Sequence, residues 1–211
     1  MTVLWVVAAL VPTVNLVGGR GESPDTAGPP PAVAAASAVP DLPDTPSPSA
    51  APHRPGASGP HLPRSRPVRL LIPKISVDAP FTALAINDSG QLEPPPPNDT
   101  NLVGWYAKGH TPGEPGTAII AGHVDTTTAP AVFAGLNELK KGDRFQVARA
   151  DGSKATFAVD ATESFEKDAF PSDRVYGDTP RAQVRLITCS GSYDRQARDY
   201  TENLVVFAHL V

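Results

Sequence analysis

Proline is distributed very unevenly along this chain, and its distribution divides the chain into three parts. Of the 25 prolines in the 211 residues, 12 lie between Arg20 and Arg66. Each proline removes a backbone donor and fixes φ, so this stretch is poorly suited to helices or sheets. We therefore expect one folded domain, residues 67–211, and a separate short segment, residues 1–19, on the other side of the proline-rich stretch.

Residues 20–66 are rich in Pro, Ala, Ser and Gly and contain no Phe, Tyr, Trp, Ile or Met. Such a composition cannot bury enough apolar area to offset the entropy of ordering the chain. We expect a disordered, semi-extended linker that holds the folded domain away from a membrane. The plainer alternative is low-complexity sequence that is tolerated without a role of its own.

Residues 1–19 carry no charged side chain and are mostly apolar. A membrane-spanning helix needs about 20 apolar residues, so the segment is marginal in length, and Pro12 and Asn15 weaken it further. The linker beside it offers nothing to pack against, which favours a membrane anchor or signal segment over a buried core helix. Without a clear small-residue cleavage site, an uncleaved anchor is favoured. An uncleaved anchor predicts that the protein is located at the cell membrane, with the folded domain facing outward.

Short apolar or alternating runs separated by turn signals dominate residues 67–211. They predict about eight strands and, around Ala169, a short helical turn. They also predict a hairpin of residues 143–150 and 154–161 around an Asp-Gly turn. Helical spacing of apolar residues predicts one brief helix over residues 131–139. This pattern indicates a single all-β domain, either a barrel or a sandwich.

Composition excludes several classes of function. The formal net charge of −4 gives no electrostatic reason to expect nucleic-acid binding. The single cysteine can form neither an intramolecular disulfide nor a zinc-binding pair, and the five histidines show no metal-ligand spacing. No glycine-rich phosphate motif is present, so we expect no cofactor and no metal. The acidic residues Glu163, Glu166 and Asp168 favour a solvated turn over a calcium site.

Two apolar strands are each expected to end at a reactive side chain. Residues 183–189 run up to Cys189 and break into Ser-Gly-Ser, and residues 116–123 run up to His123. Arg195 follows six positions after the cysteine. A thiolate nucleophile needs a neighbouring imidazole or cation, so this pattern favours a cysteine–histidine catalytic site. The alternative is a buried, inert thiol in a non-catalytic binding module, because free cysteines are among the most buried residues.

The fragments Gly122-His123-Val124-Asp125 and Leu186-Ile187-Thr188-Cys189 resemble the histidine and cysteine motifs of sortases. The run from Thr188 to Arg195, followed by Tyr200 and Asn203, is most similar to the actinobacterial class F type, as is Gly104-Trp105-Tyr106. The resemblance covers residues 67–211. It implies a closed eight-stranded β-barrel with one or two short helices, here preceded by the apolar N-terminal segment and the linker.

The resemblance also implies an activity. Sortases cleave an LPxTG-like sorting signal of an exported protein between Thr and Gly, and an amine of a peptidoglycan precursor then resolves the cysteine thioester. Cys189 would be the nucleophile, and His123 the acid and base for the two amines. The implied partners are sorting-signal proteins and this amine, and a monomer is expected. A hydrolytic cysteine protease is a further alternative.

The remaining site residues are less uniquely defined. In many sortases the catalytic arginine lies on the last strand, where this chain has Asn203, so Arg195 and Arg198 are both candidates. Arg195 is favoured for substrate binding and oxyanion stabilisation, because it stands in a Tyr-Asp-Arg sequence. Asp125 is either an orienter of His123 or a turn residue. Tyr106 and Thr188 are expected to contact substrate, with core packing and strand filling as the plain alternatives.

The resemblance also implies a pH dependence. Reaction needs thiolate and imidazolium together, and in sortases this pair is expected to be the minor protonation state. The rate should therefore follow a bell-shaped profile whose limbs belong to the coupled Cys189–His123 pair.

Overall fold

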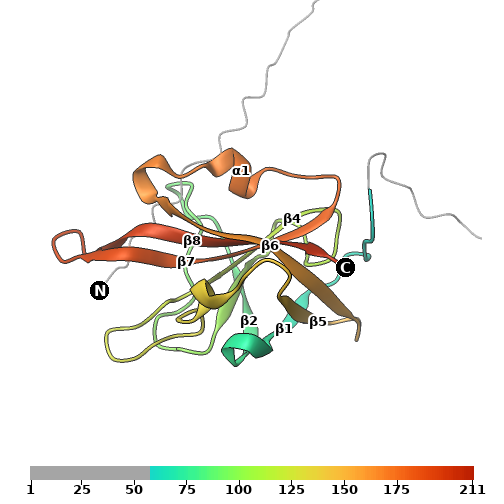
Figure 1. The fold of residues 1–211 in the computed structure, drawn as a ribbon, viewed down its shortest axis with the longest axis horizontal. Coiled ribbons are helices and arrows are strands. Elements are labelled where there is room, and N and C mark those ends of the chain that lie inside the picture. Colours follow the sequence, from blue (N-terminus) through green and yellow to red (C-terminus); the bar gives the residue numbers. More distant parts are fainter. Residues whose placement is uncertain (1–57) are drawn as a thin grey trace, which may run out of the picture. The chain divides into compact units, whose positions relative to one another are not determined.

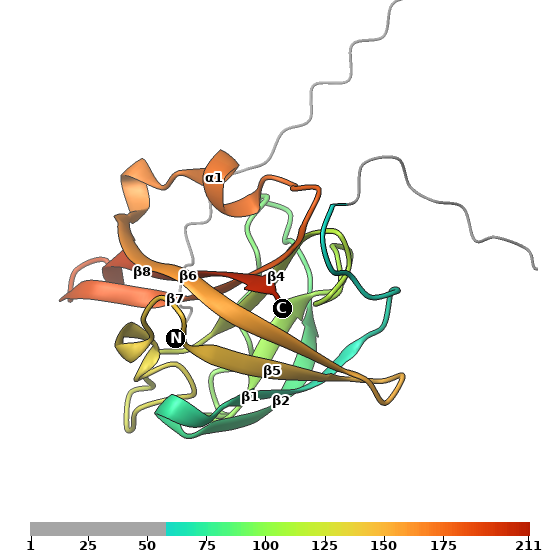
Figure 2. The same cartoon turned by 45° about the vertical axis from the view of Figure 1, so that its right-hand side comes forward.

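The structure is a computed structural model, and it describes residues 58–211 of the chain. Eight strands close into one barrel in the order β1-β2-β3-β4-β7-β8-β6-β5 (Figures 1 and 2). The strands are β1 (Pro67–Ile72), β2 (Val77–Leu84), β3 (Val103–Tyr106), β4 (Gly116–Gly122), β5 (Arg144–Arg149), β6 (Lys154–Glu166), β7 (Ala182–Asp194) and β8 (Asp199–Leu210). The helical elements are the α-helix α1 (Ser172–Tyr176) and three single 3₁₀ turns, η1 (Pro73–Ile75), η2 (Leu136–Glu138) and η3 (Lys167–Ala169). The predicted closed eight-stranded barrel with short helices is confirmed.

The interior of the barrel is filled by alternate side chains of its strands. Phe145 and Phe157 stack there with ring centroids 5.4 Å apart. Because successive residues of a strand point to opposite faces, one residue in two enters this core. In the strands that carry the predicted site, the inward residues are Ala118 and Ile120 of β4, Val184 and Leu186 of β7, and Leu204, Val206, Ala208 and Leu210 of β8.

A second apolar core lies outside the barrel. The connection from β6 to β7 contains η3 and α1, and in Figure 1 it passes over the sheet formed by β8, β7 and β4. Beneath it are packed the outward residues of those strands together with Phe170 and Val175 of the connection. The sheet is therefore covered on both faces, which explains why all seven residues of β4 are buried.

The predicted helix over residues 131–139 is wrong. Only η2 within it is helical, and the rest forms turns. The backbone N–H groups of Ala131 and Phe133 bond to the carbonyls of Val124 and His123 rather than to the segment itself. Its apolar side chains, including Leu136, still pack into the barrel core. The helical spacing therefore reflects burial of a turn against the barrel.

Strand β7 does not end at Cys189 as predicted. It continues to Asp194 and pairs with β8 from Asp199, so that the two form a ribbon that projects beyond the barrel (Figure 1). A register shift between Ser190 and Tyr193 accommodates Gly191, whose φ is 78°. The exposed polar residues of this ribbon lack the apolar alternation by which strands are recognised.

The last residues of the predicted linker, which was expected to run to residue 66, are among those that the structure describes. Leu62 donates its N–H to the carbonyl of Gly113 over 2.8 Å, and Arg64 pairs with Glu114 at 3.0 Å. Residues 62–66 of the predicted linker therefore contact the barrel. The predicted anchor, residues 1–19, lies outside the described residues. Among residues 58–211, no helix has the length and apolar character needed to cross a membrane.

Gly122, which ends β4, should not tolerate a side chain. An added Cβ would lie 2.6 Å from the ring of Phe133 and 2.9 Å from Val132. We expect Gly122→Ala to lower the free energy of unfolding by about 1–3 kcal/mol through overpacking. Urea unfolding measures this. The double variant Gly122→Ala/Phe133→Leu should lose less free energy of unfolding than the two single variants together, because the smaller side chain at position 133 relieves the clash. A loss equal to the sum of the two single losses would contradict this explanation.

Candidate active site

The pairing of β4 with β7 brings the predicted catalytic residues together. The two strands are parallel neighbours, and Ala121 of β4 lies opposite Ile187 of β7. Carried two residues further, the same register places His123 beside Cys189. Both lie at the carboxyl ends of their paired stretches, and Ile119, Ala121, Ile187 and Cys189 all belong to the outer core. Alternation therefore directs both reactive side chains to the outer face of the barrel.

Thr188 ties these two strand ends to each other. Its hydroxyl donates to the carbonyl of Gly122 over 2.9 Å, and the residue is only 1% exposed. This bond joins the residue before Cys189 to the residue before His123. Thr188 therefore helps to fix the relative position of the two strand ends that carry the reactive side chains.

A cavity of about 380 Å³ opens at this point. It is lined by His123, Val124, Asp125, Thr126, Thr127, Cys189, Tyr193, Arg198, Asp199 and Tyr200. The histidine and the cysteine thus reach one common space, together with residues of the β7–β8 ribbon.

The ring of His123 is held by the connection between β2 and β3. Its Nε2 lies 2.8 Å from the carbonyl oxygen of Pro95. A carbonyl oxygen can only accept, so Nε2 carries a proton in this arrangement. The residue is 7% exposed, so the ring is largely enclosed, and this contact contributes to its orientation.

Cys189 lies in a desolvated environment with charged neighbours. It is 5% exposed, and its Sγ lies 3.8 Å from Nζ of Lys167, the first residue of η3. Burial raises the pKa of the Cys189 thiol to about 11; the carboxylates of Asp199 and Asp125 act in the same direction, and Lys167 opposes them. The resting thiol is therefore neutral near pH 7, and thiolate must form as a minor species.

Asp125 is bound to the ribbon. Tyr200 of β8 donates its hydroxyl to the carboxylate of Asp125, and this hydrogen bond raises the pKa of Tyr200 to about 12, with burial as a smaller cause. Tyr193 packs edge-on against Tyr200, with centroids 5.3 Å apart. The Asp125 carboxylate and the two tyrosines therefore form one side of the cavity.

The two candidate arginines lie in the same exposed turn, residues 195–198, at the tip of the ribbon. Of the two, Arg198 lines the cavity that contains His123 and Cys189. Arg198 has a positive φ of 57°, which turns the chain back toward the barrel before β8 begins. The geometry thus brings Arg198 to the reactive pair. The preference for Arg195 came from local motif similarity.

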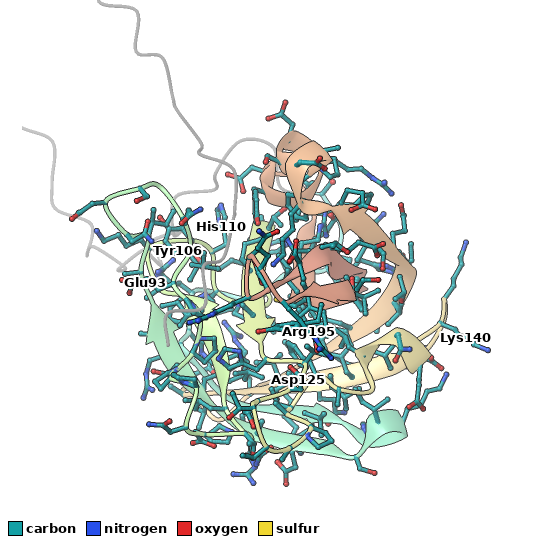
Figure 3. All side chains as sticks on the ribbon, turned by 90° about the vertical axis from the view of Figure 1, so that its left-hand side faces the viewer. Glu93, Tyr106, His110, Asp125, Lys140 and Arg195 are labelled. Atoms are coloured by element: carbon teal, nitrogen blue, oxygen red, sulfur yellow. The ribbon has the colours of Figure 1, made fainter. Side chains whose placement is uncertain are left out.

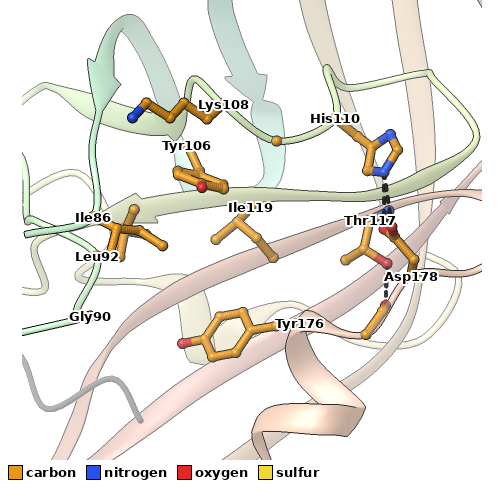
Figure 4. Close-up of a pocket in the computed structure, with 12 residues that line it drawn as sticks. Ile86, Gly90, Leu92, Tyr106, Lys108, His110, Thr117, Ile119, Tyr176 and Asp178 are labelled. Carbon is orange, nitrogen blue, oxygen red and sulfur yellow. Dashed lines mark hydrogen bonds and ion pairs between the residues drawn. The ribbon is translucent and has the colours of Figure 1, made fainter. Parts of the chain in front are cut away.

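Tyr106 lines a second cavity, of about 390 Å³, on the same side of β4 (Figure 4). Its lining is mainly apolar, with Ile119 of β4 and Tyr176 of α1 on facing walls. One end is polar, where His110 lies 3.0 Å from the carboxylate of Asp178. Figure 3 shows Tyr106 and His110 together on one side of the barrel, apart from Asp125 and Arg195.

Sequence reasoning missed Lys167 and the Pro95 carbonyl as parts of the site, and noted Tyr200 only as part of the motif after Cys189. No local pattern marks Lys167 or Pro95, because each reaches the site through packing of a segment distant in sequence from Cys189 and His123. Within residues 58–211, no group of three or more His, Cys, Asp or Glu side chains could hold a metal ion.

A closed eight-stranded barrel with cysteine and histidine at the ends of neighbouring parallel strands is the arrangement of the sortase class. The model of the sortase domain matches residues 70–211, and the chain belongs to the sortase family, whose members are cysteine transpeptidases. The comparison with curated proteins gives no match.

Several solved sortase structures resemble this fold. Sortase C1 of Streptococcus agalactiae in complex with MTSET is 24% identical, with a TM-score of 0.52; the alignment covers 68% of this chain and 66% of that one. Sortase C-1 of Actinomyces oris is 26% identical, with a TM-score of 0.52 and coverages of 69% and 74%. Sortase A of Corynebacterium diphtheriae is 21% identical, with a TM-score of 0.52 and coverages of 71% and 62%. The chain thus spans about two thirds of the length of these neighbours.

The desolvated environment of Cys189 predicts a steep pH dependence of its reactivity. With its pKa raised to about 11, the rate of alkylation should rise about tenfold per pH unit between about pH 7 and 10, because only the thiolate reacts. Timed labelling of the full chain with a thiol reagent measures this rate, and Cys189→Ala gives the background. A plateau reached by pH 8 would mean that the thiol is not desolvated in this way.

Proposed function

We propose that this protein is a membrane-anchored sortase transpeptidase. It cleaves an LPxTG-like sorting signal between Thr and Gly through a thioester on Cys189, and transfers the acyl group to an amine of a cell-wall precursor. One observation carries the proposal: the register of β4 and β7 sets His123 beside Cys189 in one cavity. Membership of the sortase family supplies the substrate class.

In the proposed reaction Cys189 is the nucleophile and His123 transfers the protons. The Cys189 thiolate attacks the Thr carbonyl carbon and forms a C–S bond; His123 gives its proton to the departing glycine amine as the C–N bond breaks. The incoming amine then attacks the thioester, loses a proton to His123 and releases the thiolate. The high pKa of the free thiol makes the reactive pair a minor species, and supports the expected bell-shaped pH profile.

Arg198 is the arginine that we assign to the substrate. It lines the cavity with Cys189 and His123, and its guanidinium can donate to the carbonyl oxygen on which negative charge develops. Arg195, at the tip of the ribbon, is then free to contact more distant parts of a substrate.

The sorting signal is proposed to lie along the outer face of β4. Thr117 and Ile119 of β4 line the second cavity, and His123, one residue beyond the end of β4, lines the first. At about 3.3 Å per residue, Ile119 is roughly 13 Å from His123. An extended signal with its Thr at Cys189 carries its Leu about 10 Å away, near the apolar wall formed by Ile119 and Tyr106.

The incoming amine is proposed to approach from the opposite side of the reactive pair. There the Asp125 carboxylate lies beside Tyr200 and Tyr193, at the base of the ribbon. A carboxylate flanked by aromatic rings is suited to a primary ammonium group, through charge and cation–π attraction. This wall would orient the amine before it loses its proton.

Anchoring and subtype form the finer part of the proposal. The uncharged apolar residues 1–19 would hold the protein in the cell membrane, with residues 20–66 as the spacer to an outward-facing domain. The run from Thr188 to Arg195 supports the class F subtype. Membrane fractionation of cells that express the full chain, and a sorting-peptide library offered to it, test these two points.

The central experiment incubates the full chain with a fluorogenic LPxTG peptide and an amine. We expect cleavage that Cys189→Ala abolishes and that Arg198→Ala lowers by about 10²-fold or more, with a smaller loss in Arg195→Ala. Mass spectrometry should find the amine joined to the Thr carbonyl. Hydrolysed product alone would indicate a protease. No turnover by folded protein across several signal variants would favour a binding module.

The apolar cavity gives a prediction about substrate binding. Tyr106→Ala should raise KM for a Leu-containing sorting peptide by about tenfold, since a lost apolar contact is worth about 1–3 kcal/mol. The alkylation rate of Cys189 should change much less than KM, because Tyr106 lines the other cavity and shares with Cys189 only the outer core against which both pack. Lys108→Ala, at the rim of the same cavity, is the matched control. If the two substitutions alter KM equally, the Leu does not bind against this wall.

A further inference from the structure

Lys167 is a charged residue in the site that has no role in the mechanism above. It is the first residue of η3, directly after β6, and its side chain is only 9% exposed. Burial of an ammonium is costly unless the charge is compensated. Here Nζ lies 2.6 Å from the Asp199 carboxylate, itself 12% exposed, and 3.8 Å from Cys189 Sγ. The ammonium thus lies between a carboxylate and the reactive sulfur.

We propose that Lys167 is a catalytic residue whose ammonium stabilises the Cys189 thiolate, with Asp199 limiting that effect by holding the same ammonium. The inference rests on the proposed function in one respect, namely that Cys189 is the nucleophile. It adds a cation supplied by the β6–β7 connection to the arginine supplied by the β7–β8 ribbon.

The charges around the sulfur decide how strong this effect is. Lys167 approaches from η3, Asp199 and Tyr200 from β8, and His123 and Asp125 from the end of β4; Tyr193 and the exposed guanidinium of Arg198 line the same cavity from the ribbon. Both carboxylates oppose formation of the thiolate, and so does burial. Lys167 acts against all of these, and its contact with the sulfur is direct. Removal of this ammonium should therefore make the thiolate much rarer.

The alternative is a purely structural ion pair that fastens the β6–β7 connection to β8. The two explanations differ in the sign of one comparison. If Lys167 and Asp199 matter only as an ion pair, removal of either breaks the same contact and has the same effect on the site. If the charge on the sulfur matters, removal of the cation and removal of the anion have opposite effects on the thiolate.

The experiment measures alkylation of Cys189 in the full chain as a function of pH, for Lys167→Met, Lys167→Arg and Asp199→Asn. Lys167→Met should lower the rate at pH 8 by about tenfold or more, because an opposite charge within about 4–6 Å strongly favours the ionised form. Lys167→Arg keeps the charge and should retain most of the rate. Asp199→Asn should raise the rate above that of the unsubstituted protein.

Lys154→Met is the matched control. It removes an exposed lysine from the far end of β6, on the order of 40 Å of strand away, well beyond the screening length. Its alkylation rate should be unchanged. Thermal unfolding of each variant checks that the barrel is intact. If Lys167→Met does not fold, Asp199→Asn still separates the two explanations: a higher alkylation rate supports the charge effect on the thiolate, and a lower rate supports a purely structural ion pair.

The proposal is overturned if Lys167→Met and Asp199→Asn change the alkylation rate of Cys189 in the same direction. It is also overturned if folded Lys167→Met leaves that rate unchanged. Alkylation requires no sorting peptide, so this result is independent of whether the protein cleaves one. A protein that shows opposite signs but never turns over a sorting signal would retain the Lys167 assignment for the thiolate and lose the proposed function. With an active protein, Lys167→Met should lower kcat while Tyr106→Ala acts on KM.

Discussion

The parallel pairing of β4 with β7 is the constraint on which the candidate site depends. Parallel neighbours end at the same edge of a sheet, so a residue just beyond each strand meets the other there. The register that joins Ala121 to Ile187 sets His123 against Cys189, and the Thr188 hydroxyl bond to Gly122 locks that register at its end. A slip of one residue would turn one reactive side chain into the barrel core.

The cover over this edge determines the chemistry of the thiol. The β6–β7 connection buries an apolar layer on the outside of the sheet, and Cys189 lies within that layer. The desolvation that raises the thiol pKa is thus a consequence of the same packing that stabilises the outer core. The connection also introduces Lys167 at the sulfur. The β6–β7 connection therefore both desolvates the Cys189 thiol and supplies the ammonium that partly offsets this effect on its pKa.

Local pattern predicted the strands of the barrel well and its irregular parts poorly. Apolar alternation located β5 and the first part of β6, because burial on one face leaves a period-two trace. Continuous apolar runs located the inner halves of β7 and β8, which are buried on both faces. The turn around Leu136 carries helical spacing for a different reason, since its side chains fill one region of the barrel core. The outer halves of β7 and β8 leave no such trace, because the ribbon that they form is exposed on both faces. Because β7 continues to Asp194 instead of ending at Cys189, Arg195 lies in the turn beyond the strand.

The sequence by itself determined the all-β class of residues 67–211, and it pointed to the cysteine and the histidine that line one cavity in the structure. Apolar patterning and an abrupt change from apolar to small residues are local properties that a one-dimensional pattern preserves. Tertiary structure alone decided that Arg198 rather than Arg195 lines the cavity, that Pro95 holds His123, and that Lys167 contacts Cys189. The Pro95 and Lys167 contacts join segments that are not strand neighbours, and depend on how a connection folds back over the sheet. The position of Arg198 depends on how the turn between β7 and β8 bends.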